Sequence, residues 1–242
     1  RVPRAMSAAP EPSPGDFDPY AAPYGRALDQ GLSVSGEGQD YFARARVVWL
    51  RRRLDALGVK PRHVLDFGCG TGAATPHILA LLAPESVRGV DVSARSLEEA
   101  RRSHPDARVT FGALVDSPAA GQSDLAFCNG VFHHIPRSER AAALGYVRQA
   151  LRPGGLFAFC ENNPWNPGTQ LVMARIPFDR DAIKIAIPEA RRLLQAAGFA
   201  VLSVDTLFYF PRSLAFLRGL EPALARWPLG AQYMVLARRI TD

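Results

Sequence analysis

The fold is decided by one short stretch, Val64-Leu65-Asp66-Phe67-Gly68-Cys69-Gly70-Thr71-Gly72. Residues 63–67 form an apolar run typical of a buried strand, and a helical pattern follows over residues 73–82. The glycines between them permit backbone angles that other residues avoid, and they let a ligand lie against the main chain. A helix that begins behind such a turn offers N–H groups to an anionic group. The stretch therefore predicts a nucleotide-binding crevice in an open α/β sheet.

An acidic residue before the glycines distinguishes between two kinds of nucleotide-binding crevice. Gly68, Gly70 and Ala73 also satisfy the G-x-G-x-x-G/A pattern of NAD-binding proteins. Asp66, however, stands two residues before the first glycine, where a carboxylate would repel a pyrophosphate but suits an ammonium or sulfonium group. The stretch closely resembles motif I of the class I S-adenosylmethionine-dependent methyltransferases, whose usual form is near Val-Leu-Asp-x-Gly-Cys-Gly-Thr-Gly.

Two further signals agree with this resemblance. Asp91 ends the apolar run 87–92, 19 residues after Gly72, where an acid can accept hydrogen bonds from both hydroxyls of a ribose. A role as a helix cap is the alternative for Asp91, although Ser93 is the better N-cap. The run Leu-Arg-Pro-Gly-Gly at 151–155 resembles another signature of the family that NAD-dependent dehydrogenases lack.

The resemblance implies S-adenosyl-L-methionine as cofactor and S-adenosyl-L-homocysteine as product. It places the methionine part of the cofactor against Asp66 and the glycine loop. Adenine recognition is open between backbone groups near Ala113 and Leu114 and the later Asp116, because the acid that many relatives carry after strand three is missing. No metal site is predicted. The predicted cofactor-binding residues are Asp66, Gly68, Cys69, Gly70, Gly72, Asp91, Val92, Ala113, Leu114, Asn129 and Gly130.

Residues 124–128 and 156–161 are expected to form strands four and five, with a helix at 137–150 between them. Residues 168–187 are poorly periodic, and residues 199–210 are expected to form strand six.

Candidate catalytic residues follow strands four and five. His134 aligns with the commonest histidine of the family, and a side-chain pKa near 6.5 suits removal of a proton from an acceptor hydroxyl. A purely structural role in packing the crevice is the alternative for His134. Glu161 is the second candidate base, and His133 is included beside its neighbour.

The acceptor is expected beyond the carboxyl ends of the strands, because ligands of open α/β sheets bind there. The loop after strand five contributes Asn162, Asn163 and Trp165 as predicted substrate-binding residues, with turn chemistry as the alternative for the asparagines. Tyr24, Tyr41 and Arg46 are predicted from the segment before motif I, where packing and solubility are alternatives.

The predicted fold is α/β and Rossmann-like. A seven-stranded, mostly parallel sheet with an antiparallel last strand carries helices on both faces. Residues 1–23 are expected to be a flexible arm that begins with a tag remnant, and residues 24–60 a helical cap. Residues 61–242 are expected to form the methyltransferase domain. Insertions at about 162–187 and 211–230 are expected to form its acceptor pocket.

Composition limits the classes of function and partner that the protein can have. The chain has 242 residues, a net charge of +6 and 21% charged residues, and its basic residues are scattered over predicted helices. We therefore expect a small-molecule acceptor and no nucleic acid. No run is long and apolar enough for a transmembrane segment. The three cysteines have no metal-ligand spacing and are expected to be reduced, in a cytoplasmic protein that is a monomer or homodimer.

These observations predict methyl transfer from S-adenosylmethionine to an oxygen or nitrogen of a small biosynthetic molecule, by in-line displacement. One alternative is an RNA or protein methyltransferase, which the net positive charge permits. The other is a protein that binds S-adenosylmethionine without turnover, because motif I and Asp91 indicate only binding.

Overall fold

The computed structural model describes residues 31–176 and 182–241. The predictions made for residues 1–23, for Tyr24 and for the first residues of the helical cap lie outside this part of the chain.

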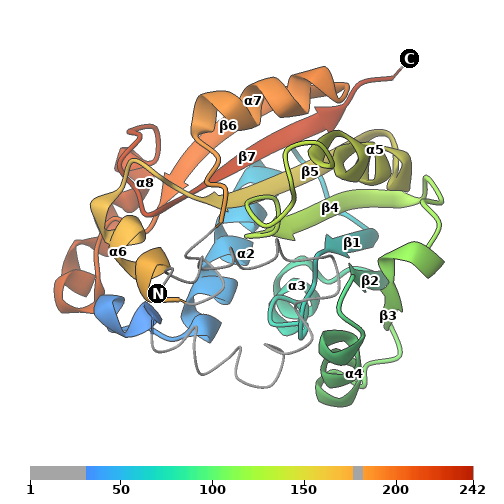
Figure 1. The fold of residues 1–242 in the computed structure, drawn as a ribbon, viewed down its shortest axis with the longest axis horizontal. Helices are drawn as coiled ribbons and strands as arrows, with labels where there is room; N and C mark the ends of the chain where they lie inside the picture. The colour runs from blue at the N-terminus through green and yellow to red at the C-terminus, as the bar shows by residue number, and fades with distance from the viewer. Residues whose placement is uncertain (1–30, 177–181, 242) are drawn as a thin grey trace, which may run out of the picture.

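A seven-stranded sheet with the order β3-β2-β1-β4-β5-β7-β6 forms the centre of the protein (Figure 1). Neighbouring strands from β3 to β5 are parallel, and β7 runs antiparallel to both β5 and β6. The predicted fold class is thereby confirmed. The strands are β1 (His63–Phe67), β2 (Ser86–Asp91), β3 (Val109–Ala113), β4 (Ser123–Asn129), β5 (Leu151–Asn162), β6 (Phe199–Leu207) and β7 (Gln232–Arg239).

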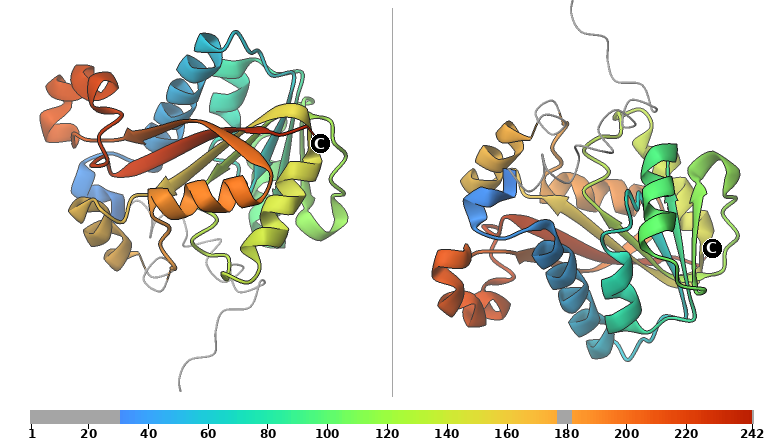
Figure 2. Two further views of the ribbon diagram at one scale, coloured as in Figure 1. Left: turned by 90° about the horizontal axis from the view of Figure 1, so that it is seen from above. Right: turned by 90° about the horizontal axis from the view of Figure 1, so that it is seen from below.

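Helices cover both faces of this sheet, which explains why its central strands are apolar on both sides. Helices α2 (Gln39–Ala56) and α3 (Thr75–Leu82) pack on one face through Leu50, Leu54 and Ile78. Helices α5 (Arg140–Ala150) and α7 (Ile187–Ala196) pack on the other through Leu144 and Leu194 (Figure 2). Helix α4 (Ala94–Ser103) connects β2 to β3.

The strand order reverses between β1 and β4, and this reversal opens a crevice at the carboxyl ends of the strands. In the register of the sheet, Phe67 at the end of β1 lies beside Val90 of β2 and Cys128 of β4. Asp91 lies beside Ala113 of β3. Residues that follow these strands therefore meet at one edge, although they are far apart in the sequence.

Segments outside the sheet gather at the end where β5 and β6 finish (Figure 1). Arg218 joins two of them, because its Nη1 donates to Glu37 Oε1 at 2.9 Å. Asn166 Nδ2 donates to the Leu229 carbonyl at 2.7 Å and joins the two predicted insertions. The segments are the 3₁₀ turn η2 (Ser33–Ser35), helix α6 (Pro167–Arg175), the 3₁₀ helix η4 (Arg212–Leu220) and helix α8 (Glu221–Leu224).

Two elements around the glycine loop and strand five begin elsewhere than the sequence indicated. The helix expected from residue 73 begins at Thr75, because the glycine turn continues through a hydrogen bond from Thr75 N to Gly72 O. Strand five was expected from residue 156 but begins at Leu151, which pairs with Ser123. A register shift after that pair accommodates the Pro-Gly-Gly run within the strand.

Three further boundaries differ. Helix α5 begins at Arg140 instead of residue 137, after the turn that follows Pro136. Strand β6 ends at Leu207 instead of residue 210, because Phe208 has a positive φ of 64° that no regular strand accommodates. The insertion read as aperiodic contains helix α6, whose start is fixed by Asn166 accepting a hydrogen bond from Thr169 N.

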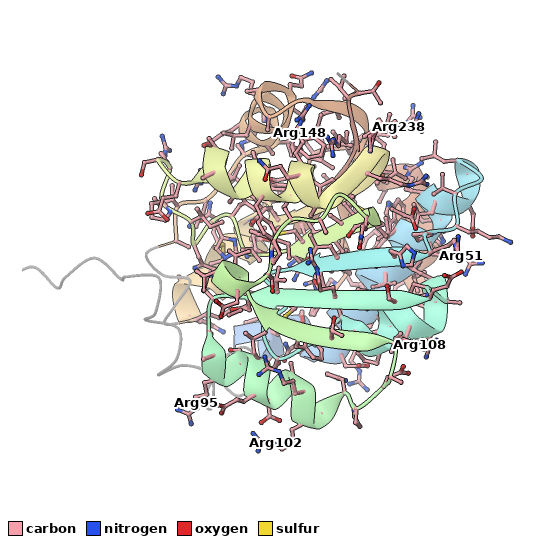
Figure 3. All side chains as sticks on the ribbon, turned by 90° about the vertical axis from the view of Figure 1, so that its right-hand side faces the viewer. Arg51, Arg95, Arg102, Arg108, Arg148 and Arg238 are labelled. Carbon is pink, nitrogen blue, oxygen red and sulfur yellow. The ribbon has the colours of Figure 1, made fainter. Side chains whose placement is uncertain are left out.

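Arginines lie on widely separated elements around the molecule. In Figure 3, Arg95 and Arg102 lie on α4, while the other labelled arginines come from α2, α5, β7 and the segment before β3. Among the described residues, no helix combines the length and apolar character needed to cross a membrane. Cys69, Cys128 and Cys160 are buried free thiols.

Gly68 offers a test of the turn on which the fold depends. Its φ is +70°, and a Cβ added there would lie 2.3 Å from Val131 Cγ2. Gly68→Ala should therefore lower the free energy of unfolding by about 1–3 kcal/mol in urea titration. Gly145→Ala, inside α5 with nothing within 4 Å of the added Cβ, should leave stability unchanged or raise it slightly. Equal effects of the two substitutions would contradict the assigned strain.

Candidate functional site

A cavity of about 390 Å³ opens at the carboxyl edge of the sheet. One wall comes from the glycine turn after β1 and the segment after β4, and the other comes from α2, α6 and the end of β6. The cavity brings together many residues that the sequence predicted for different roles. They are Asp66, Gly68, Cys69, Gly70, Asn129, Gly130, His133 and His134 on one side, and Tyr41, Arg46 and Asn162 on the other.

Asp66 is the most strongly perturbed acid of this cavity. Its side chain is buried at the end of β1, with 3% of the residue exposed, and its Oδ2 has no hydrogen-bond partner among the described residues. Burial, followed by repulsion from the Asp91 carboxylate, raises the pKa of Asp66 to about 7. A cationic group placed beside it would give Oδ2 a hydrogen-bond donor and would favour the ionised form of the carboxyl group.

Asp91 connects strand β2 to the glycine turn. Its Oδ2 accepts a hydrogen bond from Gly70 N at 2.8 Å, and its Oδ1 accepts one from Ser93 N at 2.9 Å. A carboxylate offers about four lone-pair sites, so this arrangement remains compatible with hydrogen bonds from ribose hydroxyls. The contact with Gly70 was not anticipated, because nothing in the spacing of the two residues indicates it.

The glycine turn is held by its own amides. Gly68 N and Cys69 N both donate to Val90 O, at 2.8 and 3.1 Å. These bonds fold the turn back onto β2 and leave its main chain along the cavity, where Thr71 and Ala73 also lie. The turn is consequently a preformed wall, against which a ligand can lie closely.

These features fit S-adenosylmethionine. The buried and partnerless Asp66 oxygen suits the ammonium group of a methionine moiety. The Val131 side chain occupies the place that a Cβ at Gly68 would need, so a glycine is required at this point of the turn. Ala113 lies beside Asp91 in the sheet, as a site for the adenosine part requires. The roles of Val92, which is 46% exposed, and of Leu114 stay predictions.

The catalytic candidates form a buried cluster. His133 Nδ1 lies 2.5 Å from Glu161 Oε2, and Glu161 Oε1 accepts a hydrogen bond from Phe132 N at 2.8 Å. Both side chains are almost fully buried, whereas His134 is half-buried with its ring centroid 4.1 Å from that of His133. The sequence indicated His134 as the first candidate for a general base. The structure instead brings His133 into direct contact with Glu161.

Arg140 fixes the backbone of this cluster and was not identified from the sequence. It is 1% exposed. Its Nε donates to the carbonyls of Phe132 and Ile135 at 3.2 and 3.1 Å, and its Nη2 donates to Ile183 O at 2.9 Å. The guanidinium therefore joins the turn that carries His133 to the segment before α7.

The structure corrects the expectation for part of the loop after β5. Asn163 is fully buried, and its Nδ2 donates to the carbonyls of Pro228 and Gly230 while its Oδ1 accepts from Trp165 N. This amide joins two loops and does not line the cavity. Trp165 is 48% exposed and also lies outside the cavity lining, so of the three predicted loop residues only Asn162 faces the cavity.

Comparison with known proteins relates part of the chain to a known family. Residues 65–157 match a family model described as a methyltransferase domain. A malonyl-[acyl-carrier protein] O-methyltransferase from Halalkalibacterium halodurans is 31% identical over 112 residues, which are 43% of this chain and 41% of that relative. A trans-aconitate 2-methyltransferase from Azoarcus sp. is 30% identical over 146 residues, or 60% of this chain and 53% of that relative. The chain thus spans about half the length of these relatives, or less.

A solved S-adenosylmethionine-dependent methyltransferase from Mesorhizobium loti shares the fold, with a TM-score of 0.57, 22% identity, and coverage of 78% of this chain and 96% of that one. Residues 65–157 therefore resemble the methyltransferase-domain family, and the fold is the one that this S-adenosylmethionine-dependent methyltransferase adopts.

The raised pKa of Asp66 predicts a pH-dependent affinity for the cofactor product. S-adenosylhomocysteine carries an ammonium group, which needs the ionised carboxylate. Below pH 7 that carboxylate must first lose a proton, so affinity should weaken about tenfold for each pH unit and level off above pH 7. Calorimetric titration between pH 5 and 8 checks this. Asp66→Asn should weaken binding at pH 8 and flatten the profile, and an unchanged slope in this variant would contradict the assignment.

The raised pKa of Asp66 also makes the stability of the ligand-free protein depend on pH, in the direction opposite to that of cofactor binding. Because the pKa of Asp66 is raised in the folded protein, its protonated form stabilises the fold at acid pH, and this contribution is lost as the pH rises through about 7. Asp66→Asn mimics the protonated form. The difference in unfolding free energy between this variant and the wild type should therefore grow in favour of the variant from pH 5 to pH 8.

Proposed function

We propose that the protein transfers a methyl group from S-adenosylmethionine to a small-molecule acceptor by in-line displacement. The observation that carries the proposal is the placement of the buried Asp66 carboxylate and the His133–Glu161 pair on one cavity. Asp66 accounts for binding of a cationic cofactor, and the pair accounts for proton removal from an acceptor.

In this proposal, side chains and backbone groups of the protein hold the reactants. When bound, S-adenosylmethionine supplies a methyl group already activated on a sulfonium. Asp66 binds the ammonium group, Asp91 binds the ribose, and the glycine turn orients the ligand along the edge of the sheet. Alignment of two bound reactants lowers a barrier by about 7–11 kcal/mol, so positioning is the main task of these residues.

His133 is the proposed general base, in place of the neighbouring His134. The Glu161 carboxylate accepts a hydrogen bond from Phe132 N, and it fixes the proton of a neutral His133 ring on Nδ1. Nε2 then carries the lone pair that can accept a proton. This arrangement favours O-methylation of a hydroxyl, because a neutral amine or an ionised acid needs no base.

A small acceptor is supported by the size of the cavity and by the relatives. A volume of about 390 Å³ lies in the range of small-ligand sites. The relatives include a malonyl-[acyl-carrier protein] O-methyltransferase and a trans-aconitate 2-methyltransferase. The proposed acceptor pocket comprises the cavity-lining residues of the two insertions (about 162–187, of which 177–181 lie outside the described part of the chain, and 211–230), among them Val172, Met173 and Pro211.

Calorimetry with S-adenosylmethionine, S-adenosylhomocysteine and NAD tests the cofactor. The first two should bind with micromolar dissociation constants, whereas NAD should not bind. Asp91→Ala should weaken both by at least about tenfold, because it removes two hydrogen bonds that hold the turn and the proposed ribose contact. Glu98→Ala, which removes an exposed acid of helix α4, is the matched control.

Three results would contradict the proposal. Failure of S-adenosylmethionine to bind would remove the cofactor assignment. Binding without transfer of a radiolabelled methyl group to any acceptor in a metabolite panel would favour a non-catalytic binding protein. Transfer to RNA or protein, but to no small molecule, would favour the macromolecular alternatives.

Variants of the two histidines separate their roles. His133→Asn should lower kcat by about 10²–10⁴-fold, the usual contribution of a general base, while the dissociation constant of S-adenosylhomocysteine stays within about twofold. Glu161→Gln should lower kcat and shift the pH profile, since it removes the charge beside His133. These rates are measured with the acceptor that the panel identifies.

His63→Gln, at the amino end of β1 and outside the cavity lining, should leave kcat unchanged. If His134→Asn removes activity and His133→Asn does not, the base is His134, as the sequence alone indicated.

A further inference from the structure

Three aromatic rings form one cluster in the cavity lining, on the side formed by α2 and the end of β6. Tyr41 and Phe42 are neighbours in helix α2, and Phe208 follows strand β6. The ring centroid of Phe208 lies 4.9 Å from that of Phe42 and 6.3 Å from that of Tyr41, and the two rings of α2 are 5.3 Å apart. These residues are here called the aromatic wall (Tyr41, Phe42 and Phe208).

The backbone holds Phe208 in a strained conformation. Its φ is +64°, in the left-handed region that bulky side chains rarely adopt. Outside the glycines, only Ala83 shares a positive φ in the described part of the chain. Phe208 O accepts a hydrogen bond from Ala231 N at 3.1 Å, and Gly230 packs so tightly on the strand end that an added Cβ would lie 2.6 Å from Leu207 O. Strain that neighbours impose in this way is typical of ligand-binding positions.

Arginines orient two rings of the aromatic wall. The Arg218 guanidinium lies 4.6 Å from the ring centroid of Tyr41, and its Nη1 is paired with Glu37. The guanidinium of Arg46, a buried residue, lies 5.8 Å from the ring centroid of Phe208. Cation–π contacts of this kind fix a ring before a ligand arrives, which reduces the ordering that opposes binding.

Part of this aromatic surface is accessible inside the cavity. Phe42 is 8% exposed, whereas Tyr41 and Phe208 are half-buried. Phe210, which is also half-buried, lines the same cavity two residues further along the chain. An apolar ligand would bury this surface, and a planar ring would add edge-to-face or offset-stacked contacts that a saturated body lacks. The accessible rings therefore favour an aromatic ligand over an aliphatic one of equal size.

We propose that the aromatic wall binds the ring of an aromatic acceptor. The inference rests on the proposed function, which it deepens by naming the substrate class as aromatic hydroxy compounds. The proposed cofactor residues follow β1 and β4, whereas the wall belongs to α2 and the end of β6, so the two reactants occupy different parts of one cavity. On the side of the wall, Val172, Met173 and Ile176 add aliphatic side chains that suit the flat faces of a ring.

Binding of two matched probes tests the proposal without an assay of turnover. 2-Naphthol and trans-decahydro-2-naphthol share the same fused-ring carbon skeleton and one hydroxyl group, and they are titrated by calorimetry into the protein saturated with S-adenosylhomocysteine. The saturated probe has no less apolar surface, so burial alone gives 2-naphthol no advantage. The wild type should bind 2-naphthol about three- to tenfold more tightly, and Phe208→Leu should remove this preference.

Two further variants control the interpretation. Phe208→Tyr retains a ring and should keep the preference, which separates loss of the ring from misfolding. Phe216→Leu removes an 80% exposed ring outside the cavity lining and should also keep the preference. The more acidic hydroxyl of the naphthol is the same in every titration, so only the ring contacts change between variants. All variants should bind S-adenosylhomocysteine with the affinity of the wild type.

Equal or weaker binding of 2-naphthol, binding of neither probe, or a preference that survives Phe208→Leu would each overturn the proposal. In these cases normal affinity for S-adenosylhomocysteine would leave the cofactor assignment intact. Methyl transfer to aliphatic acceptors alone would overturn the aromatic class and leave the proposed transfer standing. Loss of S-adenosylhomocysteine binding by the wild type would instead overturn both.

Discussion

The two hydrogen bonds accepted by the Asp91 carboxylate hold the cofactor side of the crevice together. One comes from the glycine turn after β1 and the other from the residue that caps α4, so a single side chain fixes strand β2, the turn and the next helix. Ser93 Oγ then accepts from Ser96 N and starts the helix. Because the turn is fixed before any ligand arrives, less ordering opposes binding.

This rigidity has an electrostatic consequence at Asp66. The carboxylate lies in a low-dielectric position near Asp91, and both burial and repulsion disfavour its charge. A fold that leaves a buried acid without a partner is less stable than one that pairs it, and such strain is typical of functional sites.

Much of the cofactor side could be read from the sequence, and much less of the acceptor side could. Asp66, Gly68 and Asp91 stand at or just after the ends of short apolar runs that do form parallel strands, so their meeting at one edge follows from the α/β topology. The acceptor side depends on contacts across long separations. Gln232 orients Arg46 although 186 residues separate them, and no local pattern indicates such a pair.

The loop after β5 shows the same limit. Its asparagines are equivalent in composition, yet Asn163 joins two loops in the interior, while Asn162 faces the cavity. Alternation along the strand sends neighbours to opposite sides, and only the packed neighbours decide which side is the cavity.

The sequence by itself determined the fold class, the crevice and the chemistry of the cofactor, because glycines, strand-end acids and hydrophobic periodicity act locally. Tertiary structure decided which histidine meets Glu161, why Arg140 is buried, and that Arg46 lines the same cavity as Asp66. Those outcomes depend on the register and packing of distant segments, and their physical cause is the burial of charged groups that only neighbours from elsewhere in the chain can stabilise.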